Sequence, residues 1–179
     1  KSWSTYSPLD MGRKWIKRGN DVFNRLRNLP QLTVANLNGH TIGGGIELAL
    51  CCDIRIARPN AKLSNPEVML GMVPGWMGIE RVLNQVGPVV GRQMLMLGKR
   101  LTAQEALAAN LIDEVVEKEQ IESWMANQLA HLEKCGPVAL AHIKQLIPAL
   151  ENKHADYSHQ LLAGLMSATH DCQQATRAF

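Results

Sequence analysis

The chain carries the run Asn38-Gly39-His40-Thr41-Ile42-Gly43-Gly44-Gly45-Ile46-Glu47. Its glycine triplet lies between a strand-like segment, 32–37, and an almost wholly apolar segment, 46–52. Glycine lets a backbone approach a ligand closely, and the N–H groups at a helix N-terminus favour negative charge. The run therefore predicts a strand, a glycine turn and a buried helix, with a backbone anion site where the helix begins.

The pattern on either side extends this order. Apolar residues at helical spacing cover about 9–28, and alternating patterns at 53–57 and 61–64 predict strands. Strand, glycine turn, helix and strand are the order of a βαβ unit. Further along, the sequence predicts a strand at 113–116 and helices at 78–86, 88–97, 102–110, 118–134, 137–152 and 154–170. We expect an α/β core over 1–116 and a helical region over 117–179.

Composition limits the classes of protein to consider. A chain of 179 residues fits one domain or a large part of one. Hydrophobic residues make up 46% and aromatic residues only 4%, so the core must be mainly aliphatic. The net charge of +3 is spread along the chain, and its one basic cluster, 13–18, is typical of a solvated helix face rather than a nucleic-acid site. No apolar run is long enough to span a membrane.

Several common motifs are absent from the sequence. The cysteines, Cys51, Cys52, Cys135 and Cys172, form no Cys-x-x-Cys pair, which favours free thiols in a reducing compartment. The histidines show no metal-ligand spacing, so no metal site is predicted. The triplet is neither Gly-x-Gly-x-x-Gly nor a nucleotide P-loop.

Two glutamates flank the predicted anion site. Glu47 follows the triplet inside an apolar run, and Glu67 follows in Asn65-Pro66-Glu67. Glu47 by itself also fits an exposed or ion-paired helix position, and Glu67 also fits an acid that complements a helix dipole. Together they suggest two carboxylates facing one small volume, where one takes a proton and the other gives one. Crowding would raise at least one pKa.

Beyond the glutamates, a series of short motifs occurs in the order found in the crotonase superfamily, the enoyl-CoA hydratase/isomerase proteins. The chain resembles that family most clearly from Thr33 to Val116. The matching pieces are Asn38-Gly39, Gly43-Gly44-Gly45-x-Glu47-Leu48-Ala49, Cys52-Asp53-Ile54, Pro66-Glu67, Leu70-Gly71, Pro74-Gly75, Gly78, Arg81, Leu101-Thr102-Ala103-x-Glu105-Ala106 and Leu111-Ile112.

The resemblance implies a fold and an activity. The fold is a crotonase-like ββα spiral, α/β in class and lacking its first turns, with a helical C-terminal region that assembles trimers or dimers of trimers. The activity is addition of water across the double bond of a 2-enoyl-CoA thioester in fatty acid metabolism. Glu47 and Glu67 fall on the two catalytic acids and Gly44 on one oxyanion donor. Gly43, Gly75 and Trp76 join the oxyanion and substrate-binding part.

The same resemblance implies no cofactor, since coenzyme A is part of the substrate. The spread of charge and the lack of a long apolar run argue against a nucleic-acid or membrane partner. With free thiols we expect the cytoplasm, or the mitochondrial matrix if a leader has been removed. In the family a first oxyanion donor lies in a loop that would fall upstream of Lys1. Trp76 and Met77 replace small residues of the family. Two alternatives stay open: another crotonase reaction (isomerisation, thioester hydrolysis or decarboxylation), or a non-catalytic truncated homologue that acts as a binding or assembly subunit.

Overall fold

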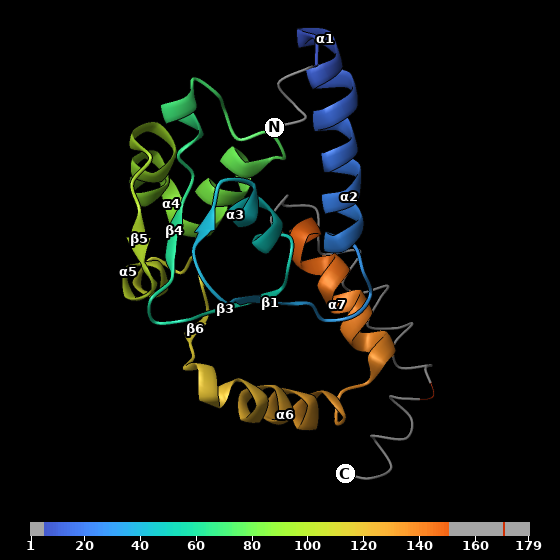
Figure 1. Cartoon of the computed structure of the whole chain (residues 1–179). Coiled ribbons are helices and arrows are strands. Elements are labelled where there is room, and N and C mark those ends of the chain that lie inside the picture. Colours follow the sequence, from blue (N-terminus) through green and yellow to red (C-terminus); the bar gives the residue numbers. More distant parts are fainter. Residues whose placement is uncertain (1–5, 151–169, 171–179) are drawn as a thin grey trace. The chain divides into compact units, whose positions relative to one another are not determined.

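The computed structural model describes residues 6–150 and residue 170 (Figure 1). Two compact units are present, one made of Lys1–Arg27 and Thr33–Gln120, the other of Asn28–Leu32 and Ile121–Phe179. The predicted helix at 154–170 lies outside the described residues apart from residue 170. The predicted division at 116/117 into core and oligomerisation region stays a prediction.

The first unit begins with one helical stretch, which confirms the helix predicted at 9–28. It comprises α1 (Pro8–Asp10), a π-helical segment η2 (Met11–Ile16) and α2 (Lys17–Arg27). Ser7 starts it, because its side chain accepts a hydrogen bond from the N–H of Asp10. The π-helical segment was not predicted.

Six short strands form two sheets in the described part of this unit. Sheet A orders β1 (Val34–Leu37), β3 (Ile54–Ala57) and β6 (Glu114–Val115), all parallel. Sheet B orders β2 (Thr41–Ile42), β4 (Lys62–Ser64) and β5 (Leu101–Thr102), the last antiparallel. Because β1–β2 and then β3–β4 each place one strand in each sheet, the chain winds as a spiral.

Helices join the successive turns of this spiral (Figure 1). The helix after the triplet, α3 (Gly44–Ala49), begins two residues earlier than predicted because Gly43 caps it, and it ends before Cys52. A 3₁₀ turn, η3 (Glu67–Leu70), was not predicted. The two helices predicted at 78–86 and 88–97 form α4 (Gly78–Leu97), which is broken at Gly87, where φ is 71°. A capping box at Thr102 starts α5 (Ala103–Ala108).

The core between sheets and helices is aliphatic, as the composition predicts. Its buried residues are Leu37, Ile46, Ala49, Leu50, Ala57, Ala61, Leu63, Val82, Met94, Leu101, Ala103, Ala106, Leu111 and Ile112. Side chains from α3 and from both halves of α4 meet here, which fixes the glycine turn against the sheets.

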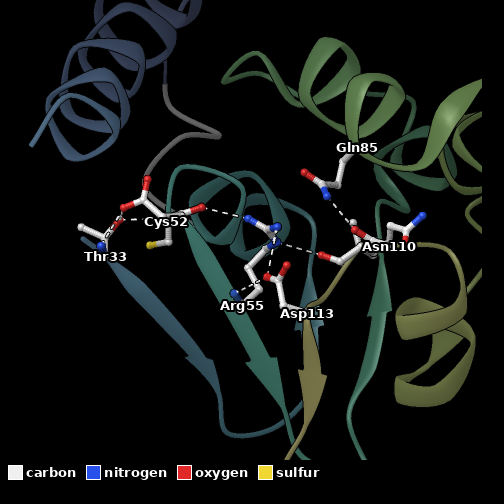
Figure 2. Close-up of polar contacts among 8 residues, drawn as sticks. Thr33, Cys52, Arg55, Gln85, Asn110 and Asp113 are labelled. Carbon is white, nitrogen blue, oxygen red and sulfur yellow. Dashed lines mark hydrogen bonds and ion pairs between the residues drawn. The ribbon is translucent and has the colours of Figure 1, made fainter. Parts of the chain in front are cut away.

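A buried arginine joins strands β3 and β6 of sheet A (Figure 2). The guanidinium of Arg55 lies 3.2 Å from Oδ2 of Asp113 and donates to the carbonyl oxygens of Cys52 and Leu111. The backbone N–H of Arg55 donates to the same Asp113 oxygen at 2.7 Å. These contacts hold the chain where it enters the last strand of the sheet.

Apart from the non-helical segment 28–32, the described part of the second unit consists mainly of two helices. They are α6 (Ile121–Leu132), which follows the 3₁₀ turn η4 (Lys118–Gln120), and α7 (Pro137–Leu150). Within this unit Nζ of Lys144 donates to the carbonyl of Gln31 at 2.7 Å. Among the helices described, none is long and apolar enough to cross a membrane.

Candidate active site

A cavity of about 200 Å³ lies in the first unit, between the π-helical segment, the glycine turn and the loop after β4. It contains five of the six predicted site residues, Gly44, Glu47, Glu67, Gly75 and Trp76. The rest of its lining is apolar and consists of Met11, Trp15, Ile16, Leu70, Met72 and Val73. Gly43, the sixth, does not line the cavity.

Glu47 is buried at the cavity wall and is held by backbone groups. Only 2% of it is exposed. Its Oε1 accepts hydrogen bonds from the N–H groups of Trp76, at 2.7 Å, and Gly78, at 3.1 Å. These donors lie in the loop before α4, so a distant segment of the chain fixes the carboxylate. Its Oε2 accepts no hydrogen bond from the described residues, so one oxygen is anchored and the other is available.

The environment of Glu47 favours its protonated form. Burial raises the pKa of this carboxyl above its ordinary value of 4.5, and the negative charge of Glu67 raises the pKa further. The N–H of Trp76, that of Gly78 and the charge of Arg81 act in the opposite direction. A carboxyl with a raised pKa beside a second carboxylate is the pattern expected of an acid–base pair.

Glu67 lies at the start of η3, where its side chain turns back toward the triplet. A Cβ placed on Gly43 would lie 2.7 Å from Oε1 of Glu67, so the glycine allows this approach. Gly43 also has φ of 58°, a conformation that side chains disfavour. Oε2 of Glu67 is buried and accepts no hydrogen bond within the described residues. A buried carboxylate oxygen without a donor is costly, and a water or substrate proton would satisfy it.

The backbone N–H groups at the N-terminus of α3 differ in whether they have an acceptor. The N–H of Gly43 donates to the carbonyl of Ser64 and is therefore occupied. The N–H of Gly44, the first residue of the helix, has no acceptor among the residues described. Gly44 lines the cavity with both glutamates, so a free N–H lies at the edge of the space the carboxylates face.

Sequence reasoning gave no role to Arg81, a buried cation beside this site. It is 5% exposed and donates to Oδ1 of Asn24, to the carbonyl oxygen of Glu47 and to Sγ of Cys51. Its charge lowers the pKa of Glu47 and of Cys51, although burial raises both. Only its place in the family motif distinguishes it in the sequence.

The described residues contain no group of three or more His, Cys, Asp or Glu side chains arranged to hold a metal ion.

The comparison with protein families decides the identity. The model of the enoyl-CoA hydratase/isomerase family matches residues 12–177. The chain belongs to this family. Its fold is the crotonase fold of solved enoyl-CoA hydratases, which confirms the predicted spiral.

Individual members of the family match most of the chain. The short-chain-enoyl-CoA hydratase of Clostridium acetobutylicum is 38% identical over 136 residues, which cover 76% of this chain and 52% of that protein. The chain thus spans about half the length of this curated relative.

Solved structures match the fold closely. Pseudomonas aeruginosa DspI has a TM-score of 0.89 at 26% identity, covering 99% of this chain and 69% of that one. The enoyl-CoA hydratase of Thermoplasma volcanium has a TM-score of 0.87 at 28% identity, covering 98% and 71%.

Proposed function

We propose that this crotonase-family chain hydrates a 2-enoyl-CoA thioester, with Glu47 and Glu67 as the acid–base pair. The observation that carries the proposal is that both carboxylates face one small cavity with the free N–H of Gly44. Gly75 and Trp76 line the same cavity and Gly43 admits Glu67, so these three are proposed to shape the substrate-binding part. The names of the relatives and the family match support the same class of reaction.

The proposed reaction adds one water molecule. The water oxygen forms a bond to C3 of the enoyl group while one carboxylate takes a water proton. The electron pair of the double bond moves toward the thioester carbonyl, and the N–H of Gly44 stabilises the negative charge on its oxygen. The other carboxyl, in its protonated form, gives a proton to C2. The reaction needs one of the two carboxyl groups to be protonated at the start. The raised pKa of Glu47 favours this state.

The test is hydration of crotonyl-CoA by the chain and by two isosteric variants, Glu47→Gln and Glu67→Gln. Each should lower kcat by about 10²–10⁴-fold, because an amide can neither take nor give the proton. Glu80→Gln is the control, because Glu80 is exposed in the first turn of α4 and does not line the cavity. Near wild-type turnover in both cavity variants, with folding verified by circular dichroism, would contradict the proposal.

Two further assays distinguish the alternative functions. Conversion of a 3-enoyl-CoA without hydration would identify an isomerase. Tight acyl-CoA binding in calorimetry without turnover would identify a binding subunit. The family also leads us to propose a homotrimer or dimer of trimers in the cytoplasm, for which sedimentation of the purified chain tests the assembly.

A further inference from the structure

Trp76 occupies the space next to the proposed oxyanion donor. A Cβ on Gly44 would lie 2.7 Å from Cζ3 of the indole ring, so the ring packs directly against the glycine backbone. Its backbone N–H holds Glu47 at the same time. One residue therefore fixes a proposed acid through its main chain and fills part of the cavity through its side chain.

The indole is held from behind by the first helical stretch. Its ring centroid lies 5.8 Å from that of Trp15 and 5.1 Å from that of Phe23. Gly19 is where α2 passes closest, since a Cβ there would collide with the indole nitrogen. That nitrogen is buried without a hydrogen-bond partner among the described residues. The wall behind Trp76 is therefore packed and apolar.

The π-helical segment completes the wall. Met11, Trp15 and Ile16, all in or at the end of this segment, line the cavity. A Cβ on Gly75 would lie 2.5 Å from Cδ1 of Ile16, so this segment also packs against the backbone of the loop. π-Helical turns occur often at functional sites, because the extra residue redirects neighbouring side chains.

The resulting cavity is small and has a mixed polar and apolar lining. At about 200 Å³, it is below the roughly 300–1,000 Å³ usual for pockets that enclose small-molecule ligands. Glu47, Glu67 and Gly44 contribute the carboxyl and backbone groups of its lining, and Trp76, Trp15 and Ile16 contribute apolar side chains.

We propose that Trp76, held by Trp15 and Phe23, is a specificity-determining residue that closes the acyl side of the cavity and restricts the chain to short acyl thioesters. This inference rests on the proposed function for the orientation of the substrate, with the thioester at Gly44. A longer acyl chain would need the volume that the indole occupies.

The test measures binding of butyryl-CoA and decanoyl-CoA by calorimetry, which requires no turnover. The wild-type chain should bind butyryl-CoA at least as tightly as decanoyl-CoA. Without a restriction decanoyl-CoA would bind more tightly, because burying each additional methylene normally strengthens binding by about fourfold. Trp76→Ala should tighten decanoyl-CoA binding by about tenfold or more and change butyryl-CoA binding by less than about threefold. Trp76→Leu should give an intermediate shift if the alanine variant folds poorly.

Met77→Ala is the matched control, because Met77 is the next residue and does not line the cavity. It should leave the ratio of the two dissociation constants unchanged. The inference is overturned if the wild-type chain binds decanoyl-CoA much more tightly than butyryl-CoA, or if both Trp76 variants change the two affinities equally.

The same titrations separate this inference from the proposed function. The expected selectivity without hydration of crotonyl-CoA would refute the hydratase and keep the pocket assignment. Hydration without acyl-length selectivity would support the hydratase and refute the role of Trp76 in the pocket. Absence of binding to both thioesters would overturn both.

Discussion

Glu47 and Gly78 are in contact in a way that only glycine permits. The N–H of Gly78 donates to Oε1 of Glu47 at 3.1 Å, while a Cβ on Gly78 would lie 2.5 Å from that oxygen and 2.7 Å from Cγ. Because Gly78 has no side chain, the carboxylate of Glu47 can lie directly against its backbone N–H.

Gly78→Ala should displace Glu47. The new methyl group would also lie 2.8 Å from Cβ of Pro74, so it cannot avoid Glu47 by moving toward Pro74. We expect a loss of about 1–3 kcal/mol in the free energy of unfolding. We also expect kcat for crotonyl-CoA to fall by about 10²-fold, because displacing a catalytic carboxylate by about 1 Å can reduce the rate by that factor. Gly39→Ala is the control, since a Cβ there meets nothing within 4 Å. Equal effects of the two substitutions would contradict this account.

The raised pKa of Glu47 gives stability a defined dependence on pH. The folded state binds this proton more tightly than the unfolded state does. The resulting stability is fully present below the ordinary pKa of 4.5 and is lost as pH rises through the raised pKa. Glu47→Gln lacks this titration, so its free energy of unfolding relative to wild type, measured by urea unfolding, should increase as pH rises above the ordinary pKa of 4.5.

Glu105→Gln provides a control of opposite sign. Hydrogen bonds from the N–H and the hydroxyl of Thr102 lower the pKa of Glu105 below its ordinary value of 4.5. The ionised side chain therefore stabilises the fold above that ordinary pKa, and this stabilisation is lost as pH falls through the lowered pKa. This variant should therefore lose stability relative to wild type as pH rises, while glutamine preserves the cap. A relative stability of Glu47→Gln that does not vary with pH would refute the prediction.

Gly44 and Trp76 should be energetically coupled. Gly44→Ala would push a methyl group to 2.7 Å from the indole and should cost about 1–3 kcal/mol in the wild-type background. In a Trp76→Ala background the same substitution should cost less, giving a coupling energy of about 0.5–3 kcal/mol in a double-mutant cycle of urea unfolding. Additive effects would show that the two groups do not meet.

Met77 is strained in a way that glycine would relieve. It has φ of 61° and ψ of 23° at the cap of α4 and is 41% exposed, so little packing compensates for the left-handed conformation. Met77→Gly should raise the free energy of unfolding by about 0.5–1 kcal/mol, less than the full strain because glycine also gains entropy in the unfolded chain. Asn110→Gly, at φ of 59°, should gain less, since asparagine tolerates this conformation. Unfolding monitored by circular dichroism distinguishes the two.

The ion pair of Arg55 and Asp113 should matter more than an exposed one. Asp113→Ala removes the acceptor for both the backbone N–H and the buried guanidinium of Arg55, and should cost about 2 kcal/mol in the free energy of unfolding. Asp21→Ala breaks the exposed pair with Lys17 and should cost less than about 1 kcal/mol. Similar losses in both variants would refute the structural importance of the pair that Asp113 forms with the buried Arg55.

Local patterns in the sequence predict the strand–turn–helix–strand order and both acids, whereas the spiral follows only from the resemblance to the family. Alternation marks β3, the triplet marks the start of α3, and Glu47 is the one acid in an apolar run. Strands of two residues, β2 and β5, are too short to form a pattern. Their place is set by pairing with β4.

The geometry of the site depends on contacts that no local pattern contains. The donors to Glu47 are backbone N–H groups, which every residue except proline has, so no residue type reveals them. The π-helical segment packs against the site through contacts such as that of Ile16 with Gly75, which lies far along the chain. The size of Trp76 distinguishes it from the small residues usual in the family, but its contact with Gly44 follows from the way the loop folds back.

One short segment, Glu67–Gly78, carries one proposed acid at its start and both anchors of the other acid at its end. The separation of the two carboxylates therefore depends on how many residues this segment contains. Exposed side chains that do not line the cavity, such as Val68 and Met69, place little constraint on its sequence. An insertion or deletion within the segment would displace the two acids relative to each other, so we expect relatives that use this pair to keep the segment at constant length while its sequence diverges.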